Sequence, residues 1–152
     1  MDTGQVDDRH TADAARLIAR GVARLLGDLD ADCLFEFTLR TGRRVDAIGL
    51  DRSGTFIIVE IKSGVADFRS DTKLREYTPF CDRFYFAVPM DFPLRTLPGT
   101  CGVIRADRFG GAIHREAPYI AMNAARRRAL TLRFARTAAT RLNRASGLPP
   151  GP

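Results

Sequence analysis

Residues Thr55 to Lys62 read TFIIVEIK. Residues 55–61 are apolar or β-branched apart from Glu60, a pattern typical of a strand buried on both faces. A buried charge is costly unless it is paired or binds a metal ion. Glu60 and Lys62 are two residues apart, so their side chains point to the same face of the strand. The stretch therefore predicts one small site that holds both an acid and an ammonium group.

A second strand is predicted over residues 43–50, and the loop formers DRSG that follow it predict an antiparallel hairpin. If Asp46 faces Glu60, Leu50 pairs with Phe56 and a connection of common length remains. Directly opposed residues have Cβ atoms about 4.5 to 5.5 Å apart, so both carboxylates can hold one divalent cation. A register shifted by one residue would separate the two acids onto different faces.

Asp46, thirteen intervening residues and then Glu60-Ile61-Lys62 resemble the signature of the PD-(D/E)XK nucleases, with Val45 in place of the nominal proline. In that superfamily the acids bind Mg²⁺ and the lysine assists the attacking water. The resemblance therefore implies that Mg²⁺ (or Mn²⁺) is bound by Asp46, Glu60 and the backbone carbonyl of Ile61. It also implies that Lys62 orients the water or stabilises the phosphorane.

A longer run, RRVDAIGLDRSGTFIIVEIKSGVADFRSDTKLREYTPFCDRFYFAVP, resembles the MmcB-type DNA-repair proteins of bacteria. The similarity extends through GVIRADRFGGAIHREAP and ARRRALTLRFARTAATRL and so covers most of the chain. It implies an α/β fold of the restriction-endonuclease-like (PD-(D/E)XK) type, with a mixed central sheet flanked by helices. It also implies a function in DNA repair.

One nuclease-like domain is expected over residues 11–144, because 152 residues suit a single core. Residues 1–10 are expected to form a polar tail and residues 145–152 a disordered tail. The hydrophobic patterns predict helices over 11–26, from 63 or 64 to 77, and over 121–143, with strands over 34–40, 43–50, 55–61, 82–88, 101–106 and 112–115.

Glu36 is a candidate third acid. The turn Thr41-Gly42 places it across from Asp46 if the first two strands pair with position sums of 82. In the alternative interpretation Glu36 is a solvent-facing residue on an edge strand. Both interpretations remain open from the sequence.

The helix after the third strand carries Arg69, Lys73 and Tyr77 within one stripe. The spacing Lys73-xxx-Tyr77 is similar to the QxxxY motif of RecB-like nucleases, with Lys in place of Gln. We expect Arg69 and Lys73 to contact phosphates, with Tyr77 as a further nucleic-acid-binding candidate. The alternative is an exposed helix face.

The net charge of +6 is concentrated near the C-terminus, where residues 121–152 hold seven arginines and no acid. Arg126, Arg127 and Arg128 are the candidates for phosphate contact, although a solvated helix face would show the same composition. Of the 24 basic residues only Lys62 and Lys73 are Lys. An ammonium can orient or deprotonate a water, whereas a guanidinium stays protonated.

The start of the chain lacks the basic and apolar regions of a secretory signal, and no apolar run approaches the roughly 20 residues that span a bilayer. The three cysteines are widely spaced, which favours reduced thiols and a cytoplasmic location. A DNA-repair protein there is expected to be associated with the nucleoid. Neither a Gly-rich phosphate loop nor a GxSxG elbow is present, which argues against nucleotide and serine hydrolases.

The interpretation favoured by the sequence is a DNA-repair protein whose Mg²⁺-dependent site cleaves the phosphodiester bonds of DNA. Its rival is a module of the same fold that has lost cleavage and binds DNA or recruits other DNA-repair proteins, because a fold does not establish a function. A third reading makes Asp46, Glu60 and Lys62 a buried salt-bridge cluster without catalytic role.

Overall fold

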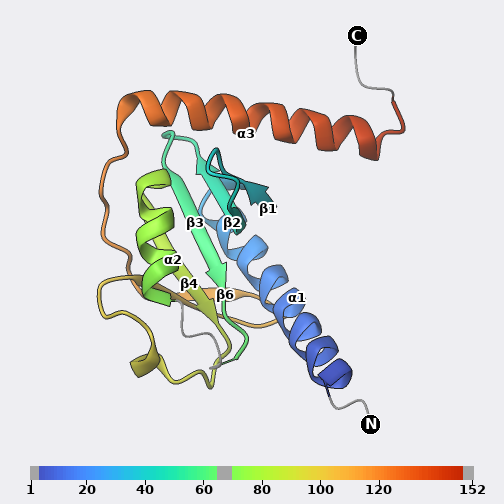
Figure 1. Cartoon of the computed structure of the whole chain (residues 1–152), viewed down its shortest axis with the longest axis vertical. Helices are drawn as coiled ribbons and strands as arrows, with labels where there is room; N and C mark the ends of the chain where they lie inside the picture. The colour runs from blue at the N-terminus through green and yellow to red at the C-terminus, as the bar shows by residue number, and fades with distance from the viewer. Residues whose placement is uncertain (1–3, 65–69, 149–152) are drawn as a thin grey trace. The chain divides into compact units, whose positions relative to one another are not determined.

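The computed structural model describes residues 4–64 and 70–148, and its centre is a six-stranded sheet with the strands in chain order (Figure 1). The elements are α1 (Gly4–Asp28), β1 (Ala31–Thr38), β2 (Arg44–Asp51), β3 (Phe56–Ile61), α2 (Ser70–Tyr77), the 3₁₀ turn η1 (Thr78–Phe80), β4 (Arg83–Val88), the 3₁₀ turn η2 (Leu94–Thr96), β5 (Gly102–Ala106), β6 (Gly111–Arg115) and α3 (Ala124–Ala145).

The sheet is mixed, as predicted. β1, β2 and β3 form an antiparallel meander, β4 and β5 run parallel to β3, and β6 returns antiparallel to β5. A parallel neighbour requires a crossover, and the segment between β3 and β4 that contains α2 supplies it. The α/β class with a mixed central sheet flanked by helices is therefore confirmed.

Both predicted hairpin registers are confirmed. Leu50 pairs with Phe56 and Ala47 pairs with Val59 across β2 and β3, so Asp46 and Glu60 follow as the next opposed positions. On the other side of β2, Phe35 pairs with Ala47, which is the register predicted for the first hairpin. The sequence left each register conditional, and the structure meets both conditions.

α1 packs on one face of the sheet, and its apolar stripe forms the main core there. Val22 and Leu26 of α1 share this core with Ala47, Val59 and Ala87 of the central strands. The opposite face carries Phe56, Ile58, Glu60 and Phe86, and α2 lies over it (Figure 1). Alternate residues of β3 therefore point to two different helices, as expected for a strand buried on both faces.

α1 approaches the turn between β5 and β6 at Gly21. A Cβ atom at this position would lie 2.2 Å from the carbonyl oxygen of Asp107 and 2.5 Å from that of Gly110. The turn is held by the Asp107 carboxylate, which accepts hydrogen bonds from the backbone N–H groups of Phe109 and Gly110. Only glycine allows the helix to come this close to the turn.

α1 begins at Gly4 and not at Thr11, where the predicted helix began. Apolar periodicity locates the buried face of a helix, and a helix can extend beyond that face. α2 begins at Ser70 and not at 63 or 64. The backbone N–H of Lys62 donates to Ala87 of β4 at 2.9 Å, which keeps the chain extended beyond the end of β3.

The chain divides into two compact units, Met1–Ala121 and Met122–Pro152. The second unit contains α3, which was predicted over 121–143 and begins later because Asn123 caps it. The Asn123 side chain accepts hydrogen bonds from the backbone N–H groups of Ala125 and Arg126. The predicted disordered tail begins inside this helix, and residues 149–152 lie outside the described part of the chain.

Among the described residues, we find no helix with the length and apolar character needed to cross a membrane.

Candidate metal centre

Asp46 and Glu60 meet where the β2–β3 ladder ends. Beyond the pair formed by Ala47 and Val59, the backbone N–H of Asp46 donates to Glu60 Oε1 at 2.9 Å. The backbone N–H of Ile61 donates to Asp46 Oδ2 at 2.8 Å. Each carboxylate is thus oriented by the main chain of the opposite strand, and the strands are joined by side chains at this point.

The Glu60 carboxyl is 2% exposed and lies beside the charge of Asp46. Burial, and next to it the Asp46 charge, raise the pKa of Glu60 to about 8, although a hydrogen bond from Asp46 and the charge of Lys73 act to lower it. At neutral pH Glu60 therefore retains its proton in most molecules. The pair carries less negative charge than two free carboxylates would.

Lys62 lies on the same face as Glu60 and is 4% exposed. Phe86 of β4 is the register partner of Glu60, and the Lys62 Nζ atom lies 5.8 Å from the centre of the Phe86 ring. A second ring, that of Phe92, is 6.0 Å from the same atom. The two rings hold the ammonium group by cation–π attraction on the face of the sheet that carries Glu60.

Lys73 of α2 is the second ammonium group at this site. Its Nζ atom lies 3.5 Å from Glu60 Oε2. One turn later, Tyr77 is buried, and its ring centre is 6.3 Å from that of Phe84. Burial, and next to it the charge of Glu60, raise the pKa of Tyr77. The structure therefore brings Lys73 to the acids and places Tyr77 in the packing between α2 and the sheet.

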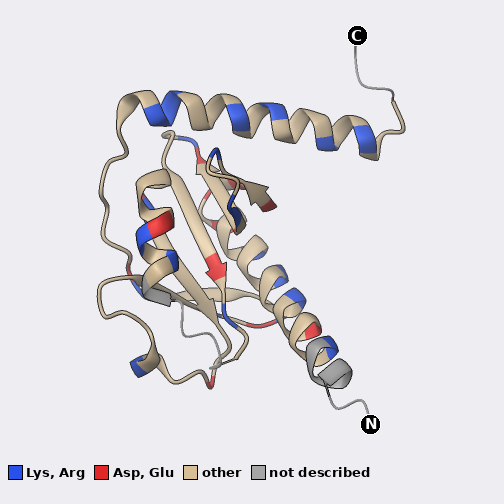
Figure 2. Ribbon diagram, in the orientation of Figure 1, with Lys and Arg blue, Asp and Glu red and all other residues tan. Residues whose placement is uncertain are grey.

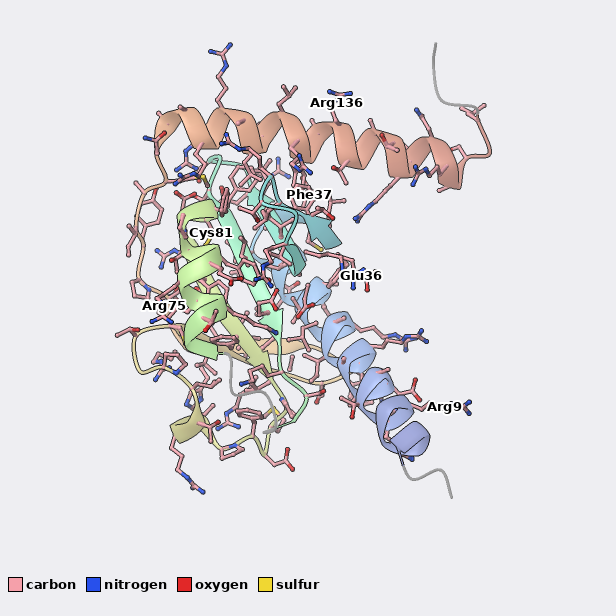
Figure 3. The ribbon with its side chains drawn as sticks, in the orientation of Figure 1. Arg9, Glu36, Phe37, Arg75, Cys81 and Arg136 are labelled. Atoms are coloured by element: carbon pink, nitrogen blue, oxygen red, sulfur yellow. The ribbon has the colours of Figure 1, made fainter. Side chains whose placement is uncertain are left out.

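Two of the predicted residues do not join this group. Glu36 lies on the edge strand β1, between the register pairs Phe35–Ala47 and Phe37–Val45, but its φ is 50° and the residue is exposed (Figure 3). Over residues 4–64 and 70–148, no three His, Cys, Asp or Glu side chains are arranged to hold a metal ion. Glu36 is thus not part of a three-acid group: its backbone is left-handed within β1, and the residue is exposed. Arg69 lies outside the described residues.

Sequence reasoning missed Asp82, a buried acid directly before β4. Its Oδ2 atom accepts a hydrogen bond from the backbone N–H of Phe56 at 2.8 Å, and its own N–H donates to the carbonyl of Phe56 at 2.9 Å. Asp82 therefore joins the starts of β3 and β4. In the sequence, the feature that could have indicated this role is the position of Asp82 directly before a strand rich in aromatic residues.

The arginines of the second unit recur along α3, with no acidic residue between them (Figure 2). Arg126 and Arg128 are exposed, and Arg127 is half-buried. The first turn of this helix therefore presents cationic side chains to solvent, as the sequence predicted.

The protein is of the α/β class, with a mixed central sheet. One face of that sheet carries the paired acids Asp46 and Glu60 with Lys62, and Lys73 of α2 contacts the pair. The chain matches the family described as DNA repair protein MmcB-like over residues 2–147, and it belongs to that family. A DNA-repair role follows from this membership. No curated protein matches the chain.

A solved structure is also similar to this chain, that of the SPO1766 protein of unknown function from Silicibacter pomeroyi. The two are 40% identical, and the similarity covers 86% of this chain and 89% of that chain with a TM-score of 0.80.

Proposed function

We propose that this protein is a Mg²⁺- or Mn²⁺-dependent nuclease of the PD-(D/E)XK type that cleaves phosphodiester bonds of DNA during repair. The observation that carries the proposal is that the carboxylates of Asp46 and Glu60, each hydrogen-bonded to the backbone of the opposite strand, lie on the face that also holds Lys62. Membership of a DNA-repair family and the order of helices and strands support it.

The donor groups suit a hard divalent cation. One oxygen of Asp46 and one of Glu60 are fixed by backbone N–H groups, which leaves a second oxygen on each. The Ile61 carbonyl is the proposed third donor. Mg²⁺ is commonly held by one or two carboxylates together with waters and substrate phosphates, so a third acid is not required. A cation at this position would also offset the repulsion between the two acids.

The chemistry follows from these positions. When bound, the ion supplies Lewis acidity, lowering the pKa of a coordinated water and neutralising charge on the reacting phosphate. Lys62 is positioned to orient that water or to donate a hydrogen bond to a phosphate oxygen. Its contacts with Phe86 and Phe92 restrict the ammonium group to the site, which reduces the entropy lost when it acts.

The exposed arginines at the start of α3 are the proposed contacts to DNA phosphates. Guanidinium groups form bidentate hydrogen bonds with phosphate oxygens, and such contacts give affinity without base specificity.

The second candidate function is a DNA-binding or partner-recruiting module without cleavage. The observation in its favour is that the pair of acids is already compensated within the chain, by the proton held on Glu60 and by the Lys73 ammonium. A site with these properties is stable without metal. Under this function the DNA contacts of α3 would remain and turnover would be absent.

Cleavage assays separate the two candidates. Purified wild type should cleave DNA in Mn²⁺ or Mg²⁺, and Asp46→Asn should lose the activity while binding DNA with unchanged affinity in the absence of metal. Lys62→Ala should also abolish cleavage and leave the salt dependence of binding unchanged. DNA binding by wild type without any cleavage would support the second candidate. Equal cleavage by wild type and Asp46→Asn would contradict the proposed site.

A further inference from the structure

Of the two lysines of the chain, Lys73 contacts the buried pair of acids, and Lys62 lies on the same face of the sheet as Glu60. Every other basic residue is Arg, and the ion pairs Arg43–Glu76, Arg52–Asp30 and Arg83–Glu116 all use a guanidinium. The ion pair at Glu60 instead uses the ammonium of Lys73. A guanidinium engages a carboxylate as a rigid fork, whereas an ammonium is a compact charge on a flexible stem.

Lys73 contacts the oxygen of Glu60 that a metal would need. Glu60 Oε1 accepts the backbone N–H of Asp46, and Glu60 Oε2 is the atom 3.5 Å from Lys73 Nζ. The Glu60 side chain is 3% exposed and that of Lys73 is 28% exposed. The ammonium group therefore enters the site from its open side, and it has a route back to solvent.

We propose that Lys73 is an internal counter-ion of the Asp46–Glu60 pair, which a divalent cation displaces when it binds. This inference rests on the proposed function, because it assigns a regulatory role at the same metal site. A divalent cation and an ammonium group sharing one carboxylate oxygen would repel each other strongly in a buried setting. Metal binding must therefore include the cost of breaking the contact between Lys73 and Glu60.

Once a divalent cation has displaced it from Glu60, the Lys73 ammonium would occupy a second position. The released ammonium remains on α2 beside the site and is available to a phosphate oxygen of the substrate. Metal binding and DNA binding would then favour each other, and this coupling is reciprocal by linkage. A Lys at this position allows the exchange, since an Arg would form a bidentate pair that is harder to release.

The test compares Lys73→Met with wild type in the full chain, with Arg75→Met as the matched control. Met keeps an unbranched apolar stem and removes the charge, and Arg75 is an exposed cation on the same helix (Figure 3). Melting temperatures are measured without metal and over a Mn²⁺ titration at one pH and one salt concentration. Calorimetric titration gives the Mn²⁺ affinity.

Lys73→Met should melt lower than wild type without metal and should bind Mn²⁺ about tenfold more tightly, since a repelling charge has been removed. Its melting temperature should rise further on adding Mn²⁺ than that of wild type. Arg75→Met should match wild type in both measurements. Lys73→Gln provides the same comparison with a variant that retains a hydrogen-bond donor, if the Met variant does not fold.

A lower melting temperature for Lys73→Met with an unchanged Mn²⁺ affinity would make the contact a structural ion pair and overturn the inference. An unchanged Mn²⁺ affinity with a salt slope of DNA binding lower by about one would make Lys73 a constitutive phosphate contact, which also overturns it. Absence of any Mn²⁺ response in wild type would contradict the metal site itself, and the proposed function with it.

Discussion

Glu60→Gln tests the electrostatics of the site through the pH dependence of stability. The pKa of Glu60 is raised from 4.5 to about 8 in the folded protein, first by burial and then by the charge of Asp46. Between these two pH values the unfolded chain has released the proton and the folded chain still holds it. The contribution of Glu60 to the free energy of unfolding is therefore fully present below pH 4.5 and is lost as the pH rises toward 8.

The size of the effect follows from linkage. One proton held only by the folded state lowers the free energy of unfolding by about 1.4 kcal/mol for each pH unit. From pH 5.5 to 7.5 the loss amounts to about 2.7 kcal/mol, or roughly 5 to 10 °C in melting temperature for a domain of this size. Gln keeps the shape of the neutral carboxyl and cannot ionise, so Glu60→Gln should not show this loss.

The assay is urea denaturation of metal-free wild type and Glu60→Gln at a series of pH values. The free energy of unfolding of the variant minus that of wild type should increase by about 2.7 kcal/mol between pH 5.5 and 7.5. Taking this difference cancels the titration of groups common to both proteins. A difference that stays constant over this range would contradict a raised pKa of Glu60, because it would mean that Glu60 is ionised in the folded state.

Two further predictions concern the close approach of α1 and the basic helix. Gly21→Ala should lower the free energy of unfolding, measured by urea denaturation, by about 2 kcal/mol, because the new Cβ atom meets backbone oxygens. Gly27→Ala is the control: it has open space around it, so the free energy of unfolding should rise by up to about 1 kcal/mol. If both substitutions raise the free energy of unfolding, α1 does not lie against the turn between β5 and β6. Replacing Arg126, Arg127 and Arg128 together with Gln should reduce the slope of log K against log salt for duplex DNA by up to about three. An unaltered slope would mean that α3 does not contact phosphates.

The β2–β3 hairpin could be predicted because it depends on local information. The alternation of side chains and the length of the turn after Leu50 leave one register that buries the apolar residues, and the structure has that register. The opposition of Asp46 and Glu60 followed from it. Lys62 could be assigned to the same face by parity alone.

The deviations from prediction depend on conformations and contacts that periodicity does not encode. Glu36 adopts a left-handed conformation inside β1, and a non-glycine residue with positive φ leaves no mark in an alternating pattern. The extended backbone at Lys62 depends on a hydrogen bond to Ala87 of β4, which is distant in the sequence. The contact of Lys73 with Glu60 joins α2 to β3, so the sequence predicted a phosphate contact and missed the ion pair.

A crystal structure of the protein grown with Mn²⁺, with anomalous scattering used to locate the metal, would show directly whether Asp46 and Glu60 bind a cation. We expect an anomalous peak between the carboxylates of Asp46 and Glu60, with Lys73 Nζ moved away from Glu60 Oε2. A peak bound elsewhere, or none at this pair in saturating Mn²⁺ with the Lys73–Glu60 contact intact, would contradict this expectation.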